Sequence, residues 1–161
     1  FDPLGALCML IGGVGWAKPV GVNVRNYKNP KIGMAVSAAA GPVSNFLLAW
    51  FSMILYKCVI YSGLGGQLPA LMLFLYDMVA MNLSLAVFNL IPIPPFDGSR
   101  IALLFLPRRL YFKAMQYERQ IMLAVLLLVF LGVLNVPLSA AVNYMWDRLV
   151  ELTAFVDVFW G

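Results

Sequence analysis

Three long stretches of the chain contain almost no charged residues, and their lengths limit the folds open to it. The first is 33–56, the second is 62–96 with Asp77 as its only charge, and the third is 121–146. About 20 apolar residues suffice for a helix to cross the hydrocarbon core of a bilayer. Charged residues make up 11% of the chain, against about a quarter in typical soluble domains. We therefore predict an all-α polytopic membrane protein with about three transmembrane helices.

We predict a single membrane-embedded domain over residues 1–161. Within it we expect a re-entrant or β segment at 1–32, core helices at 33–57 and 71–106, and C-terminal helices at 107–161. Glycines and a proline in 62–70 indicate a loop, so the second crossing should cover 71–90. The tail from Asp147 mixes acids with aromatic residues and is typical of an interfacial amphipathic segment.

The basic residues predict which way the spans run. The clusters that flank the spans are Lys18, Arg25, Lys28 and Lys31, and then Arg100, Arg108, Arg109, Lys113 and Arg119. Lys57 alone follows the first span. Cytoplasmic loops carry the excess of Lys and Arg, so the second span should run inward and end near the cytoplasm. This flanking pattern explains the net charge of +4 better than nucleic-acid binding does. We expect an integral protein of the bacterial inner membrane.

Before the first span, the stretch "KPVGVNVRN" alternates valines with other residues over 20–25. Period-two alternation predicts a half-buried strand, here at the membrane surface. A plain extended cytoplasmic loop fits the same residues about equally well.

One face of the first span carries small residues four apart, namely Gly33, Ser37, Gly41 and Asn45. This spacing lets another helix approach closely, and Asn45 can hydrogen-bond across such a contact. Packing alone would also explain the pattern.

The stretch "NLIPIPPFDG", residues 89–98, ends the second apolar run. Its three prolines, beginning with Pro92, lack N–H groups and disfavour helical geometry in the residue before each, so an unwound segment should precede Asp97. Such backbone is tolerated at membrane depth only inside protein or beside a watery cavity. Asp97 is then either the N-cap of a short helix from Gly98 to Leu106, or a metal ligand or proton-handling carboxylate.

Three segments together resemble the site-2 protease family of intramembrane zinc metalloproteases, peptidase family M50. "NLIPIPPFDG" is similar to the family's Asn-x-x-Pro…Asp-Gly signature, "AAAGPVSNFLLA" to its neighbouring core helix, and "GWAKPVGVN" to its membrane-surface β segment. They occur in the family's order and cover roughly residues 1–106. Beyond that, the chain matches only in being hydrophobic.

The resemblance implies roles for individual residues. Asp97 would be a zinc ligand, Asn89 would help to hold the substrate backbone, and Asn45 would lie near the site. Gly41, Pro92 and Gly98 would shape it. We further hypothesise that the strand containing Val22 adds an edge to which an unwound substrate pairs.

The chain also departs from the family pattern, because it contains no histidine. The family's His-Glu-x-x-His helix supplies the other two zinc ligands and the general base, so we assign no catalytic residue in this chain. We expect a sequence truncated at its amino end, which alone should not bind catalytic zinc tightly.

We predict an intramembrane zinc metalloprotease that hydrolyses peptide bonds in transmembrane segments of membrane proteins. Its partners would be substrate helices and the lipid bilayer, with no nucleic acid, and the oligomeric state is left open. One alternative is a catalytically inactive pseudoprotease that binds transmembrane helices. The other is a small transporter subunit, for which Asp77 would be essential.

Overall fold

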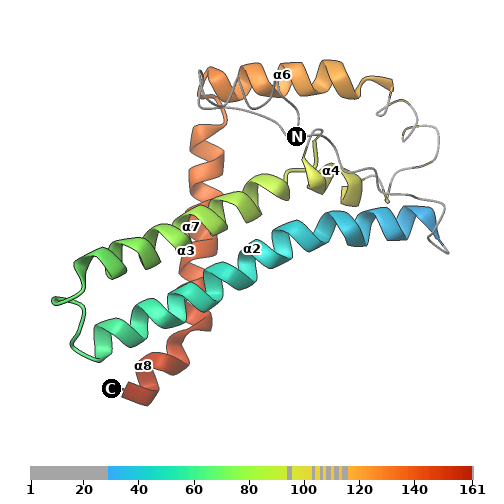
Figure 1. Cartoon of the computed structure of the whole chain (residues 1–161). Helices are drawn as coiled ribbons and strands as arrows, with labels where there is room; N and C mark the ends of the chain where they lie inside the picture. The colour runs from blue at the N-terminus through green and yellow to red at the C-terminus, as the bar shows by residue number, and fades with distance from the viewer. Residues whose placement is uncertain are drawn as a thin grey trace, which may run out of the picture. The chain divides into compact units, whose positions relative to one another are not determined.

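The computed structural model describes residues 29–160 except 94, 95, 103, 106, 108, 109, 111, 112, 114 and 115. This part is helical and contains no strand (Figure 1). The helices are α2 (Pro30–Tyr61), α3 (Pro69–Asn89), α4 (Asp97–Ala102), α6 (Glu118–Phe130), α7 (Asn135–Leu152) and α8 (Ala154–Trp160). The predicted strand at 20–25, with Val22, lies outside the described residues.

Two helices are long and apolar enough to cross a membrane, over Ile32–Tyr61 and Pro69–Asn89. They correspond to the first two spans predicted from the uncharged runs. The turn between them contains Gly63 with φ of 73°, a backbone conformation that suits glycine. Pro69 begins α3, where its missing N–H breaks no helical hydrogen bond.

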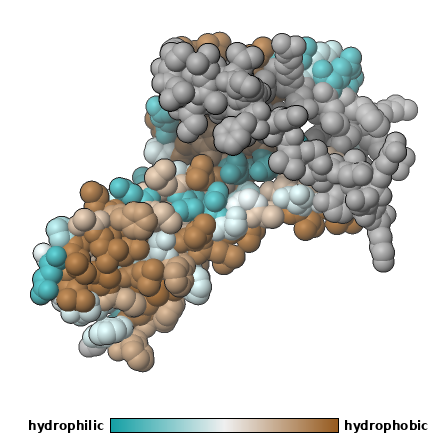
Figure 2. All heavy atoms as spheres, in the orientation of Figure 1, coloured by the Kyte–Doolittle hydropathy of each residue, from teal (hydrophilic) through white to brown (hydrophobic). Residues whose placement is uncertain are grey.

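Most of the surface of these two helices is apolar and uncovered. Only 22% of the most apolar window in α2 and 28% of that in α3 is buried, whereas a core helix of a soluble protein is mostly buried. Figure 2 shows apolar residues gathered over this region. The exposed side chains include Val43, Leu47, Phe51, Leu73, Phe74, Met81 and Leu85. A surface of this kind suits contact with lipid.

The third predicted span, 121–146, is wrong as a continuous crossing. The chain leaves α6 after Phe130 and starts α7 at Asn135, and Gly132 between them has φ of 71°. With 13 residues, α6 is about 20 Å long at 1.5 Å per residue, too short for a hydrocarbon core of about 30 Å. Pro137 does not cause the break, because it lies in the first turn of α7, where N–H groups lack helical partners anyway.

Side chains from α2, α3 and α7 form the buried core of the described part. Its members are Ala49, Met53, Val79, Leu83 and Leu149. Leu83 and Leu149 have no exposed surface. The rings of Tyr76 and Trp146 extend this contact, with centroids 5.3 Å apart. This core holds α7 against the two membrane-spanning helices.

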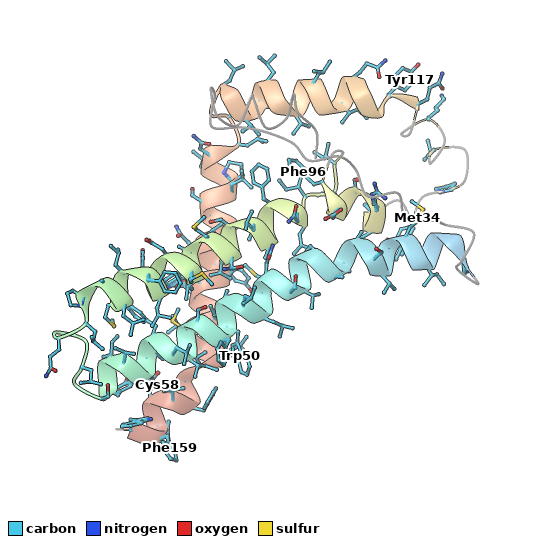
Figure 3. All side chains as sticks on the ribbon, viewed as in Figure 1. Met34, Trp50, Cys58, Phe96, Tyr117 and Phe159 are labelled. Atoms are coloured by element: carbon cyan, nitrogen blue, oxygen red, sulfur yellow. The ribbon has the colours of Figure 1, made fainter. Side chains whose placement is uncertain are left out.

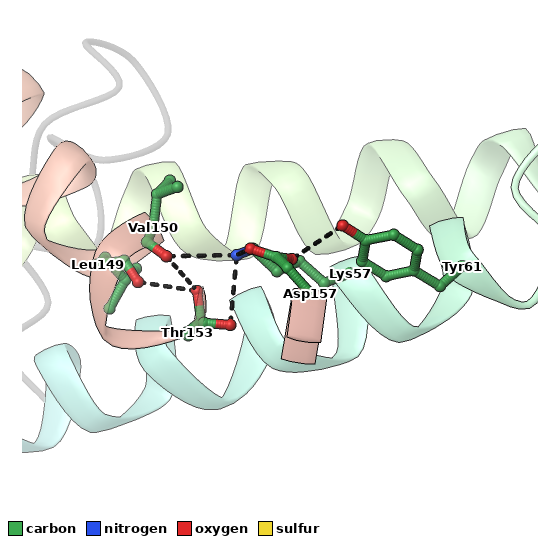
Figure 4. A network of polar contacts seen from close by, with 6 residues as sticks. All are labelled: Lys57, Tyr61, Leu149, Val150, Thr153 and Asp157. Carbon is green, nitrogen blue, oxygen red and sulfur yellow. Dashed lines mark hydrogen bonds and ion pairs between the residues drawn. The ribbon is translucent and has the colours of Figure 1, made fainter. Parts of the chain in front are cut away.

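A polar network joins the end of α2 to the end of α7 and to α8 (Figure 4). Lys57 is 8% exposed. Its ammonium donates to the carbonyl oxygens of Val150 and Thr153, both at 3.3 Å, and to the carboxylate of Asp157 at 2.7 Å. The hydroxyl of Tyr61 donates to the other Asp157 oxygen at 3.0 Å. Since the last carbonyls of a helix lack partners within it, Lys57 caps the C-terminus of α7.

The same network changes the acidity of Asp157. The hydrogen bond from Lys57 lowers the pKa of the Asp157 carboxyl below its usual range, and partial burial opposes this change. The hydrogen bond from Tyr61 and the charge of Lys57 lower the pKa further. Asp157 is therefore held in its charged form as the counter-ion of a nearly buried lysine.

Candidate functional site

The end of α3 provides one wall of the candidate site. The helix stops at Asn89, and the N–H of Leu90 still donates to the carbonyls of Ala86 and Val87, at 3.1 Å each. Beyond it, residues 90–93 are not helical. This confirms the unwound stretch that the prolines predicted. Pro92 itself is exposed.

The chain then folds back onto the end of α3. The ring of Phe96 packs edge-on against Phe88, with centroids 4.7 Å apart; Figure 3 labels Phe96 in this position. The hydroxyl of Ser99, which is 6% exposed, donates to the carbonyl of Phe96 at 2.7 Å. These contacts fix the start of α4 close to the end of α3.

At position 98 the backbone of a neighbouring segment leaves no room for a Cβ atom, so glycine is required. A Cβ built on it would overlap the carbonyl group of Leu90 and lie 2.6 Å from the carbonyl oxygen of Ile91. Because these neighbours are backbone atoms, they cannot move aside as a flexible side chain would. Glycine at the second position of α4 thus permits the close approach that brings its neighbour Asp97 to this place.

The carboxylate of Asp97 faces α2. A Cβ built on Gly41 would lie 3.5 Å from Oδ2 of Asp97, so the carboxylate lies against the small-residue face of that helix. Asp97 is half-buried and is the first residue of α4. In the described part of the chain, no donor makes a hydrogen bond to its carboxylate. The side-chain cap considered for this residue is therefore not seen among the described residues.

Two other predicted site residues, Asn89 and Asn45, lie on α3 and α2. Asn89 ends α3 and is half-buried. Asn45 is half-buried on α2, one turn after Gly41. Their roles toward a substrate stay predictions, as does that of Val22.

The described residues do not by themselves fit a catalytic zinc ion. A catalytic zinc takes three protein ligands and a water. Among the residues described here, no three His, Cys, Asp or Glu side chains come together, and the chain has no histidine. Asp97 offers one carboxylate, and a complete site would need ligands from elsewhere.

Beside the unwound stretch lies an apolar cavity of about 500 Å³. Leu90 and Ile91 line it from the end of α3, Val125 from α6, and Leu138 and Met145 from α7. The sequence offered no signal for this cavity, because it depends on how the broken third run returns to α3. Leu90 and Ile91, which line the cavity, are also the residues whose carbonyl groups Gly98 packs against.

The sequence model for peptidase family M50 matches residues 59–133. That range contains Asn89, Asp97 and Gly98, the residues whose arrangement is described above. Over this range the chain is similar to peptidase family M50.

Two curated relatives agree with this assignment. The "Putative zinc metalloprotease YwhC" of Bacillus subtilis is 39% identical over 103 residues, which are 62% of this chain and 47% of the relative. The "Putative zinc metalloprotease MJ0611" of Methanocaldococcus jannaschii is 34% identical over 99 residues, 61% of this chain and 48% of the relative. The chain thus spans about half the length of the curated relatives it matches. No solved structure matches it.

The similarity to family M50 and the exposed apolar helices both support a membrane protein. The relatives that the chain matches are named putative zinc metalloproteases. The sequence resemblance is therefore confirmed at the level of the family.

Proposed function

We propose that this chain forms part of an intramembrane zinc metalloprotease of site-2 type, which hydrolyses peptide bonds in transmembrane segments. One observation carries the proposal: the Asp97 carboxylate lies against Gly41, and the close packing of Gly98 positions it there. In this proposal Asp97 is one zinc ligand, and the remaining ligands and the general base come from residues outside this sequence.

The proposed substrates follow from the chemistry of a helix in lipid. Its peptide bonds are hidden in its own hydrogen bonds, so the segment must unwind before hydrolysis, and its freed backbone groups then need partners. We propose that the strand containing Val22 supplies such partners, and that Asn89 and Asn45 help to hold the substrate near Asp97. We further propose that the site lies toward the cytoplasm of a bacterial inner membrane, as the basic clusters suggest.

The first test is to read the coding sequence upstream of Phe1 and, if it encodes His-Glu-x-x-His, to express the longer protein with a reporter that contains a transmembrane segment. We expect Asp97→Asn to abolish cleavage of the reporter, because an amide is a poor zinc ligand. Asp147→Asn removes an exposed carboxylate on α7 and serves as the matched control. Full cleavage by Asp97→Asn would refute the ligand role. An upstream sequence without the motif, combined with substrate binding but no cleavage, would instead indicate a pseudoprotease.

The second test uses the chain as it stands. Metal analysis of the purified protein should find far less than one zinc per chain, because a single carboxylate cannot replace three ligands. Stoichiometric zinc would contradict this and would require ligands that the proposal does not include.

A further inference from the structure

Asp77 lies in the middle of an otherwise uncharged membrane-spanning helix. It is the ninth residue of α3, about 12 Å from the start of a helix that is about 31 Å long at 1.5 Å per residue. In a bilayer this depth falls within the hydrocarbon core. A carboxylate there is costly and normally faces a partner or water.

The side chain of Asp77 lies on the opposite side of α3 from the helix's buried residues. The buried residues of α3 are Leu75, Val79, Asn82, Leu83 and Ala86. Ala86 follows Asp77 by nine residues, about two and a half turns, so the two lie on opposite sides of the helix. Asp77 is accordingly exposed.

Its neighbours on the same side are also exposed. We call this surface the Asp77 face; it consists of Leu73, Phe74, Asp77, Met81, Ser84 and Leu85, all of them exposed. Helical spacing places these residues within one stripe along α3. The face is apolar except for Ser84 and the single carboxylate.

No described residue of this chain compensates that charge. The ion pairs in the described part are Lys57 with Asp157 and Arg148 with Glu151. Lys57 is the basic residue within the C-terminal half of α2, and its ammonium is fully used by Asp157 and two carbonyls. A second copy docked through the same face would bring two carboxylates together, which disfavours a homodimer here.

We propose that the Asp77 face binds a transmembrane helix of another membrane protein, and that this helix carries a lysine or arginine at the depth of Asp77. The apolar side chains supply the packing surface, and the carboxylate selects a helix with a basic residue. This surface is separate from Asp97, and the inference does not depend on the proposed protease function.

The test uses a synthetic helix of about 20 leucines with one central lysine, and a matched peptide with leucine at that position. Energy transfer in phosphatidylcholine vesicles, from a donor after Gly161 to an acceptor on the peptide, measures binding by the full chain. We expect the lysine peptide to bind about tenfold more tightly than the leucine peptide, the size of effect found for polar contacts between membrane helices. Asp77→Asn should remove this preference, whereas Asp147→Asn should keep it.

A transplanted charge makes the test sharper. In the double variant Asp77→Asn, Ser84→Asp, the carboxylate moves seven residues along the same face. The preferred lysine position in the peptide should then move by about two turns. Equal binding of both peptides to the wild-type chain, or an unchanged lysine preference in Asp77→Asn, would overturn the proposal. Self-association of the chain that Asp77→Asn abolishes would also overturn it, in favour of a second copy as the occupant.

Discussion

The close packing at Gly98 makes a prediction about two glycines of the site. Gly98→Ala places a methyl group on the carbonyl of Leu90, and both neighbours that would have to yield are backbone. Overpacking costs about 1–3 kcal/mol, and the rigid neighbours place this case at the upper end. The better helix propensity of alanine returns about 0.5–1 kcal/mol. We therefore expect a net loss of about 2 kcal/mol in the free energy of unfolding.

Gly41→Ala is the matched control, because it adds the same methyl group on the other side of Asp97. That methyl would lie 3.5 Å from Oδ2 of Asp97, an ordinary van der Waals distance. With no overlap to relieve, the propensity gain of about 0.5–1 kcal/mol should dominate and leave stability unchanged or slightly higher.

Two measurements separate these outcomes. Unfolding in detergent, followed by far-UV circular dichroism, gives the global free energy for each variant. Hydrogen exchange over 96–102 detects local opening of the fold-back even if the rest of the chain stays folded. The packing argument would be refuted if Gly98→Ala matched the wild type in both measurements, or if Gly41→Ala were as destabilising as Gly98→Ala.

Three further predictions concern the far end of the molecule and the broken third run. Lys57→Met should lower the free energy of unfolding by about 2–3 kcal/mol, since it removes charged hydrogen bonds to Val150 and Thr153; equal denaturation midpoints would contradict this. The pKa of Asp157 is lowered in the folded chain. The stabilising effect of this carboxylate should therefore be complete above the ordinary carboxyl pKa of about 4 and should fade as the pH falls through the lowered pKa. In a pH titration of the free energy of unfolding, an Asp157→Asn variant should lack this part of the acid dependence. Gly132→Ala should cost about 1–2 kcal/mol, because φ is 71° at this position; no change on thermal unfolding would show that the turn readjusts.

The sequence predicts those parts of the structure that depend on local composition. Uncharged runs located both membrane-spanning helices, because the length needed to cross lipid is a property of the segment itself. The prolines before Asp97 located the unwound stretch, because their effect on the backbone is also a property of the segment itself. The family resemblance implied that Gly98 would shape the site, although its packing partner could not be named. The match to family M50 confirms the resemblance drawn from the motifs.

Contacts between distant segments were beyond such reasoning. Nothing in the order of residues shows that the Asp97 carboxylate meets Gly41, because this depends on how the fold-back packs against α2. Hydropathy likewise did not reveal the break at Gly132 between α6 and α7, because a turn can be made from apolar residues. Lys57 was seen only as a lone basic residue after a span, because its acceptors are 93 to 100 residues away.

The long sequence separation between Lys57 and Asp157 has a consequence for the synthesis of the protein. Asp157 follows Lys57 by 100 positions, so at about 5–20 residues per second the ribosome delivers the counter-ion roughly 5–20 s after the lysine. During this interval the ammonium of Lys57, near the C-terminal end of α2, lacks this carboxylate. Helix α8 therefore completes the polar network of α2 only after this delay, and a nascent chain released before Asp157 would retain that uncompensated charge.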